Sequence, residues 1–229
     1  KKPTNEYDFV ELRGTRDLMK LDGGVLGLAL GGSYYYQKLD ADNYADCKTG
    51  SVAGLNCFYG LGTEKNSAFY AEINAPVTKT LELGAAVRYD HYSSYGGQWT
   101  PKLSAKWAAM KEVSVRGTWG KGFRAPSILE SGDAGAAFSA SGERDPLNCP
   151  VSLPSGAPDT SSPQNVPFFC SFSPTFLQGT TKDLDPEKSD NWSVGMVLEP
   201  VQGWSTTVDY YSIKLKNQIV PASSLSTFD

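Results

Sequence analysis

Residues 81–92, LELGAAVRYDHY, alternate between two kinds of side chain with a period of two. Every second side chain is apolar, and this set is Leu81, Leu83, Ala85, Val87 and Tyr89. The side chains between them are small or charged, namely Glu82, Gly84, Ala86, Arg88 and Asp90. Because successive side chains of a β-strand point to opposite faces, this pattern predicts a strand with one apolar and one polar face.

The same alternation recurs along the chain in residues 68–75, 99–109, 112–120, 192–199 and 204–216. Residues 25–38 and 7–19 complete a set of eight, although the apolar face of residues 7–19 is unclear. In residues 204–216 the pattern slips, because Ile213 and Leu215 fall on the parity opposite to Val208 and Tyr210. Either a β-bulge or a strand that leaves its apolar environment explains the slip.

The connections between these strands alternate in length. Short connections fall at residues 20–24, 76–80, 109–111 and 200–203, whereas longer ones fall at residues 39–63, 93–98 and 123–189. Outer-membrane β-barrels have short periplasmic turns and long extracellular loops, and a soluble sandwich has no reason for this alternation. The sequence therefore predicts an all-β, antiparallel, up-and-down transmembrane barrel, in part or whole, of about eight strands with long extracellular loops.

Large aromatic side chains support the same prediction, because they lie near the ends of the apolar faces. They are Tyr89, Trp99, Trp107, Trp119, Trp192 and Trp204. Aromatic side chains that flank an apolar band are typical of membrane interfaces, although the core of a soluble sandwich also contains aromatics. No stretch approaches the roughly 20 apolar residues of a membrane helix.

Charge and histidine content exclude several function classes. Lys and Arg number 21 and Asp and Glu 25, so the net charge is 21 − 25 = −4, and no Lys/Arg-rich run occurs; we expect no nucleic-acid partner. The single histidine, His91, excludes any site that needs two imidazoles and is expected at the rim of a strand. We expect neither enzymatic activity nor a cofactor.

The four cysteines form two local pairs. Cys47 and Cys57 enclose 57 − 47 − 1 = 9 residues, and Cys149 and Cys170 enclose 170 − 149 − 1 = 20. The simplest of the three possible connectivities joins each pair within its own loop, which favours an oxidising compartment. The short C-x₂₋₄-C spacings of a zinc site are missing. The acidic residues of the long loops are interpreted as solvent-exposed charges, so no metal site is predicted.

Two later motifs resemble those of TonB-dependent outer-membrane receptors. Residues 120–127, GKGFRAPS, closely resemble the receptor signature at which a strand exits into a long loop, carried by Gly122, Phe123, Arg124, Ala125 and Pro126. Residues 184–189, LDPEKS, followed by VDYYSI at 208–213, resemble a second receptor segment, carried by Pro186, Glu187 and Ser189. Residues 21–27, LDGGVLG, resemble the family's Gly-Gly periplasmic turn. Taken alone, FRAP also suits a turn, and Asp185-Pro186 also suits a helix start.

The resemblance implies a plugged 22-stranded barrel in the bacterial outer membrane that imports a scarce ligand such as a ferric siderophore, a corrinoid or a saccharide. Import would be driven by the TonB complex, which acts through the parent chain. We expect residues 1–229 to be a segment of such a barrel in contact with outer-membrane lipid, with the plug domain and the TonB box absent. A complete small barrel with a structural or adhesive role, and a secreted soluble β-sandwich binding module, are the alternatives.

The candidate ligand contacts lie in or beside the long loops. The run Tyr34-Tyr35-Tyr36 precedes the Cys47 loop, and by parity one or two rings belong to the outer aromatic girdle while the alternate ring points into the lumen mouth. An aromatic ring there could stack a planar ligand or a sugar. Arg144, in the longest loop, is a further candidate ligand contact.

Overall fold

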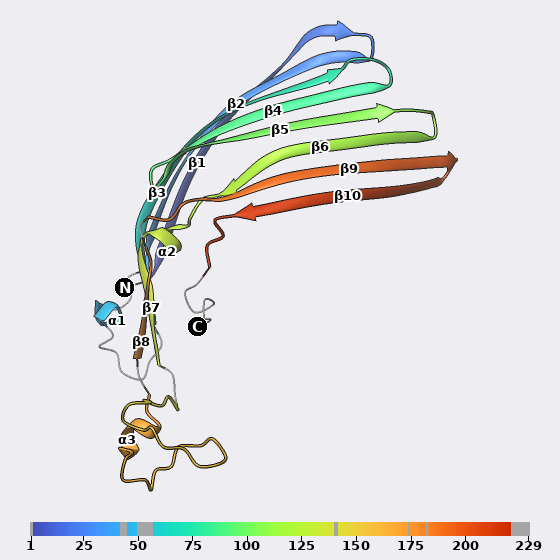
Figure 1. Cartoon of the computed structure of the whole chain (residues 1–229). Coiled ribbons are helices and arrows are strands. Elements are labelled where there is room, and N and C mark those ends of the chain that lie inside the picture. Colours follow the sequence, from blue (N-terminus) through green and yellow to red (C-terminus); the bar gives the residue numbers. More distant parts are fainter. Residues whose placement is uncertain are drawn as a thin grey trace. The chain divides into compact units, whose positions relative to one another are not determined.

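The computed structural model describes residues 2–41, 45–49, 57–139, 142–173, 175–181 and 183–220. These residues form ten strands and three short helices (Figure 1). The strands are β1 (Thr4–Leu21), β2 (Gly24–Asp40), β3 (Cys57–Pro76), β4 (Leu81–Tyr92), β5 (Gly96–Ala108), β6 (Val113–Arg124), β7 (Asp133–Ser139), β8 (Thr175–Gly179), β9 (Glu187–Val201) and β10 (Trp204–Lys216). The helices are α1 (Ala45–Thr49), α2 (Ile128–Ser131) and α3 (Pro167–Cys170).

The strands form one sheet whose main path follows chain order. Hydrogen bonds join neighbours in the order β1-β2-β3-β4-β5-β6-β9-β10, and the hairpin β7–β8 is attached beside this path through β3. Within the described residues no ladder joins β1 to β10, so the sheet is open. The predicted all-β antiparallel architecture is confirmed, and the eight predicted strands are the eight of the main path.

Side chains divide between two faces of this sheet as the alternation predicts. The register places Glu82, Lys106 and Arg116 in one row across β4, β5 and β6. The next row consists of Leu83, Ala105 and Gly117, on the opposite face. We call the face with the charged row the polar face and the other the apolar face. Of the charged residues expected in strands, only Glu112 lies elsewhere, in the turn before β6.

The pattern slip in β10 is not caused by a bulge. The ladder between β9 and β10 is continuous from Thr206 to Lys216, and its irregularity lies at Trp204/Thr206 instead. On the apolar face, Tyr210 is followed by Ser212, Lys214 and Lys216. The strand therefore leaves its apolar environment after Tyr210, which is the second explanation that the sequence allowed.

The four short connections are tight turns, as predicted, and two of them touch. A side chain at Gly23, in the turn between β1 and β2, would clash with the backbone carbonyl of Thr78, in the turn between β3 and β4. The same Cβ would lie 2.6 Å from the carbonyl oxygen of Pro76. Glycine at position 23 thus permits a close backbone contact that no other residue allows.

The connection expected to be longer at residues 93–98 is a turn of 96 − 92 − 1 = 3 residues, because β5 begins at Gly96. The other two long connections are more ordered than the sequence indicates. The expected loop at residues 39–63 contains α1, and β3 already begins at Cys57. The expected loop at residues 123–189 contains α2, β7, α3 and β8, of which β7 pairs with Cys57–Leu61 of β3. Each of these segments is too short to show a clear period of two.

The chain divides into two compact units. The wall unit comprises residues 6–37, 63–127 and 183–229, and in it β4, β5, β6, β9 and β10 lie side by side (Figure 1). The loop unit comprises residues 1–5, 38–62 and 128–182. Among the described residues, no helix has the length and apolarity to cross a membrane.

Candidate ligand-binding site

Five aromatic side chains of the wall unit form a cluster at the end of the sheet where β1 begins and where β2, β4 and β6 end. The ring centroids of Tyr7 and Tyr35 lie 5.4 Å apart, and those of Tyr35 and Tyr92 6.1 Å apart in an edge-to-face arrangement. Tyr92 stacks on Tyr95 at 4.8 Å, and Phe123 packs edge-on against Tyr92 at 5.9 Å. We call Tyr7, Tyr35, Tyr92, Tyr95 and Phe123 the aromatic cluster.

The cluster contains a polar group with no protein partner. Within the described residues, the hydroxyl of Tyr95 is buried and accepts or donates no hydrogen bond. Burial raises the pKa of this phenol, which lies in the turn between β4 and β5, so the group stays protonated and able to donate. A buried donor without a partner is costly, so a hydrogen bond to the Tyr95 hydroxyl would be favourable once the neighbouring rings move to admit an acceptor.

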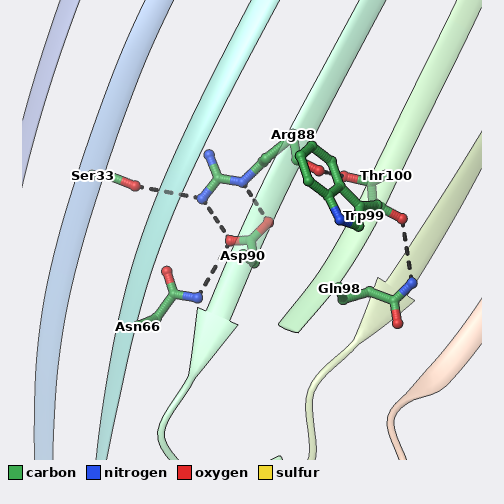
Figure 2. Close-up of polar contacts among 7 residues, drawn as sticks. All are labelled: Ser33, Asn66, Arg88, Asp90, Gln98, Trp99 and Thr100. Atoms are coloured by element: carbon green, nitrogen blue, oxygen red, sulfur yellow. Dashed lines mark hydrogen bonds and ion pairs between the residues drawn. The ribbon is translucent and has the colours of Figure 1, made fainter. Parts of the chain in front are cut away.

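A buried polar network adjoins the cluster on the polar face. The guanidinium of Arg88 donates to both carboxylate oxygens of Asp90, at 2.8 and 2.9 Å, and reaches Ser33 Oγ at 3.4 Å (Figure 2). Asn66 Nδ2 donates to Asp90 Oδ1 at 3.4 Å. Asp90 and Asn66 are only 2% and 1% exposed. This network ties β2, β3 and β4 together and fixes the strand that carries Tyr92.

A second buried carboxylate fixes the turn that carries Tyr95. Glu64, on β3, is 6% exposed and accepts hydrogen bonds from the Ser93 hydroxyl at 2.7 Å and the Ser93 amide at 3.0 Å. The Lys65 amide also donates to Ser93 Oγ at 3.0 Å. The turn is therefore held against β3 by side-chain contacts in addition to its own ladder.

The two sequence motifs meet across β6 and β9. Gly122 lies opposite Ser189 in the ladder, and Arg124 lies opposite Glu187. The Arg124 guanidinium forms a two-pronged ion pair with Glu187, with Nε–Oε2 at 2.8 Å and Nη2–Oε1 at 2.9 Å. Glu187 Oε1 also accepts from the Ile219 amide at 2.8 Å. The motif residues therefore join three segments of chain where β6 ends and β9 begins.

Glycine and proline complete this junction. A side chain at Gly122 would lie 2.7 Å from Ser189 Oγ, which in turn accepts from Asn191 Nδ2 at 2.9 Å. Pro126 and Pro186 are buried, and Ala125 is half-buried. The helix that Asp185-Pro186 could have started does not form, because Glu187 enters β9 directly. The long connection expected to begin at Phe123 begins after Arg124, the last residue of β6.

The loop unit is held by both predicted disulfides. Cys47 is bonded to Cys57 and Cys149 to Cys170, with Cα–Cα distances of 5.9 and 5.2 Å. Cys57 is the first residue of β3, so the first bond joins α1 to a strand. Lys48, beside this bond, forms an ion pair with Asp133 of β7 at 2.6 Å.

Arg144 is engaged inside the loop unit. Its Nε donates to the Cys149 carbonyl at 2.6 Å and its Nη1 to Ser152 Oγ at 2.6 Å. These bonds hold residues 144–152 together beside the second disulfide. A role for Arg144 in ligand binding stays a prediction.

The tyrosine run divides between the two faces as expected. Tyr35 joins the aromatic cluster, whereas Tyr34, which is 44% exposed, and Tyr36 lie on the apolar parity. His91 is exposed and is the penultimate residue of β4, a rim position. Among the described residues, no group of three His, Cys, Asp or Glu side chains is arranged to hold a metal ion.

Four members of the aromatic cluster were not among the sequence candidates for ligand binding: Tyr7, Tyr92, Tyr95 and, except as a motif residue, Phe123. Residues 7, 35, 92 and 123 belong to strands that pair only after folding, so chain position gives no sign of their proximity. The sequence contained one usable signal, for Tyr92. This residue occupies the same alternating positions as Arg88 and Asp90, so it could be expected on the polar face at the end of its strand.

Comparisons with known proteins point to one family. A family profile described as "TonB dependent receptor-like, beta-barrel" matches residues 3–229. The ferric enterobactin receptor PirA of Pseudomonas aeruginosa is 24% identical over 153 residues, which cover 67% of this chain and 17% of PirA.

Solved structures show the same fold. A crystal structure of PirA from Pseudomonas aeruginosa matches with a TM-score of 0.61 and 19% identity over 94% of this chain and 34% of that chain. A mutant of the ferric enterobactin receptor PfeA from the same organism, in complex with enterobactin, matches with a TM-score of 0.64 and 18% identity over 93% of this chain and 27% of that chain. A double mutant of the hemophore receptor HasR of Serratia marcescens, in complex with its hemophore HasA and heme, matches with a TM-score of 0.63 and 15% identity over 94% of this chain and 34% of that chain. The chain thus spans about a third or less of each.

Proposed function

Because the chain belongs to the TonB-dependent receptor β-barrel family, we propose that it forms part of the wall of a transporter that imports a ferric siderophore. Members of this family are non-enzymatic transporters of the bacterial outer membrane, so the apolar face is the lipid-facing side of the sheet. The long connections are then extracellular and the polar face lines the lumen. The open sheet is completed by strands from elsewhere in the whole protein, which also supplies the plug and the contact with TonB.

The observation that carries the ligand proposal is the aromatic cluster at the extracellular strand ends, in which Tyr35 and Tyr92 have the lumenal parity. Phe123, which has the parity of Trp119, packs edge-on against Tyr92. Tyr35 and Tyr92 present rings there, and the buried Tyr95 hydroxyl offers a donor without a protein partner. Flat aromatic surfaces with a hydroxyl donor suit an aromatic, oxygen-rich chelate such as a ferric catecholate. The relatives PirA and PfeA, which are ferric enterobactin receptors, support the same ligand class.

The proposal is tested by measuring ferric-enterobactin binding to the receptor that carries this segment, together with TonB-dependent growth on that chelate as sole iron source. We expect Tyr35→Ala and Tyr95→Phe to weaken binding at least tenfold and a few-fold, respectively, since the first removes a ring and the second only a donor. Tyr34→Ala, on the apolar parity, is the matched control and should leave affinity unchanged. Equal affinities in all four proteins would contradict a ligand role for the cluster.

A further inference from the structure

Along β6, β9 and β10, the residues on the apolar face change from small and aliphatic to aromatic and then to charged. Two adjacent rows cross these strands, with registers fixed by the ladders. The first row consists of Leu83, Ala105, Gly117, Val194 and Tyr210, and the second of Ala85, Leu103, Trp119, Trp192 and Ser212. Two tryptophans in one row mark the extracellular edge of the apolar band.

A groove of about 660 Å³ runs over these rows. Its floor is formed by Ala105 and Gly117, which have little or no side chain, and its sides by Leu103, Val194 and Trp192. A Cβ at Gly117 would contact only the Ser193 carbonyl oxygen, at 3.6 Å, so the space above this glycine is open. Because the groove lies in the lipid-facing surface, the molecules that can fill it are hydrocarbon chains.

Lysines follow immediately beyond the tryptophan row. The next row on the same face is Lys121, Asp190 and Lys214, and Lys188 and Lys216 lie opposite each other one row further. The Asp190 carboxylate accepts the indole N–H of Trp119 at 3.0 Å. We call Lys121, Lys188, Lys214 and Lys216 the lysine rim; with Asp190 its net charge is 4 − 1 = +3. All four are exposed, and none forms an ion pair within the described part of the chain.

We propose that the groove and the lysine rim form one binding site for a phosphate-bearing lipid of the outer leaflet. One acyl chain lies over Gly117 between Leu103 and Val194, and the phosphate contacts Lys121 and Lys214 just beyond the tryptophans. Lysines on a lipid-facing surface are stable only at headgroup level, where anionic lipid supplies the opposite charge. The order groove, tryptophan, lysine along β6 is the order acyl chain, interface, phosphate in such a lipid.

This inference rests on the proposed placement of the chain in an outer-membrane barrel. The test uses the detergent-purified receptor that carries this segment, incubated with bisphosphorylated lipid A or with the same lipid after removal of its phosphates. Bound lipid is counted by native mass spectrometry. Heat-modifiable migration checks separately that each protein has folded as a barrel.

Two variants probe the two halves of the site. Lys121→Gln with Lys214→Gln should lower lipid A affinity about tenfold or more, because each lysine near a membrane surface attracts anionic lipid. Gly117→Leu should fill the groove and also lower retention severalfold. The controls are Lys79→Gln with Lys111→Gln, which removes two charges from the short turns, and Gly27→Leu, at a position with open space on the polar face.

The result that supports the site is loss of lipid A in both variants, retention in both controls, and weak binding of the dephosphorylated lipid to the unchanged receptor. Equal retention by the lysine variant and its control, or equal binding of the two lipids, would overturn it. If Gly117→Leu fails to fold, the lysine pair still decides. The assay contains no siderophore, so a receptor that binds lipid but no ferric chelate would contradict only the proposed function.

Discussion

The wall unit and the loop unit are stabilised by different means. The wall unit is held by long antiparallel ladders, and its deeply buried side chains include the polar Glu64, Asn66 and Asp90. In the loop unit the buried set is mainly apolar, with one polar member, Asn165; the apolar members are Ala41, Cys47, Ile128, Ala134, Ala137, Cys149 and Cys170. The wall places polar groups inside and apolar groups outside, whereas the loop unit follows the ordinary arrangement of a small, disulfide-bonded protein.

The exposed apolar side chains of the wall show the same contrast. Trp99, Leu103 and Val194 are 59%, 53% and 51% exposed, which in water would be a large unfavourable surface. In a bilayer these side chains meet hydrocarbon, and the ladders satisfy the backbone groups that hydrocarbon cannot. The wall therefore depends on lipid and on hydrogen-bond register, and the loop unit on covalent bonds and local hydrogen bonds.

The strongest test of this difference between the two units is a charged substitution on the apolar face of the wall unit. Val194→Arg places a guanidinium near the middle of the apolar band and should lower the free energy of unfolding in lipid vesicles by about 2–4 kcal/mol. The matched control is Ser193→Arg on the polar face, which removes one hydroxyl hydrogen bond to Thr118 and should cost about 1 kcal/mol or less. Urea titrations followed by tryptophan fluorescence measure both in the whole receptor.

The outcome that would contradict the assignment of faces is a larger loss for Ser193→Arg than for Val194→Arg. Equal losses would mean that both positions face the same environment, which a bilayer-spanning sheet does not allow.

The wall unit could be predicted from sequence to a large extent, because apolar and polar side chains alternate along its strands with a period of two. Every strand of ten or more residues except β1 shows the alternation several times, and three of the four short turns contain glycine or proline. The strand ends were harder to predict. Beyond Tyr210 and before Ala68, strands continue where the apolar alternation has already stopped, since backbone pairing extends past the bilayer.

The loop unit could be predicted only through its cysteines. β7 and β8 have seven and five residues, and β7 contains mostly Gly and Ala, which have low strand propensity. The pairing of β7 depends on β3, more than 70 residues earlier in the chain for every partner, and β8 pairs only with β7. The aromatic cluster escaped prediction for a similar reason, because Tyr35, Tyr92 and Phe123 meet only through strand order.

The loop unit should respond most to loss of its covalent bonds. Cys149→Ser with Cys170→Ser opens a loop that the disulfide stabilises by about 3 kcal/mol, and limited proteolysis should then cleave within residues 150–169. The wall unit should keep its heat-modifiable migration, because its ladders contain no cysteine of this pair. Unreduced peptide mapping of the unchanged protein should recover both local disulfides. A shift of the whole barrel's unfolding would contradict the separation of the two units.

A smaller loss in the wall should follow from the contact between the two short turns. Gly23→Ala adds a methyl group against the carbonyl oxygens of Thr78 and Pro76, and relief requires backbone movement, at about 1–3 kcal/mol. Gly27→Ala, four residues later in β2, has no atom within 4 Å of the new methyl group and is the control. Urea midpoints distinguish them. Equal stability of the two variants would show that the turns do not touch.

The smallest effect concerns acid sensitivity in the loop unit. Asp145 accepts from Asn148 Nδ2 at 2.6 Å and from the Leu147 amide at 2.8 Å, and these bonds lower its pKa below the ordinary 3.8. A lowered pKa stabilises the folded loop above the unfolded value, and this stabilisation is lost as the pH falls through the folded value. Amide exchange at Leu147 should therefore be slower in the unchanged protein than in Asp145→Ala at neutral pH, and the gap should close below about pH 3.8. Asp145→Asn keeps an acceptor without the titrating proton, so its gap to Asp145→Ala should change little with pH. A gap between the unchanged protein and Asp145→Ala that persists in acid would mean that the carboxylate charge does not stabilise this loop.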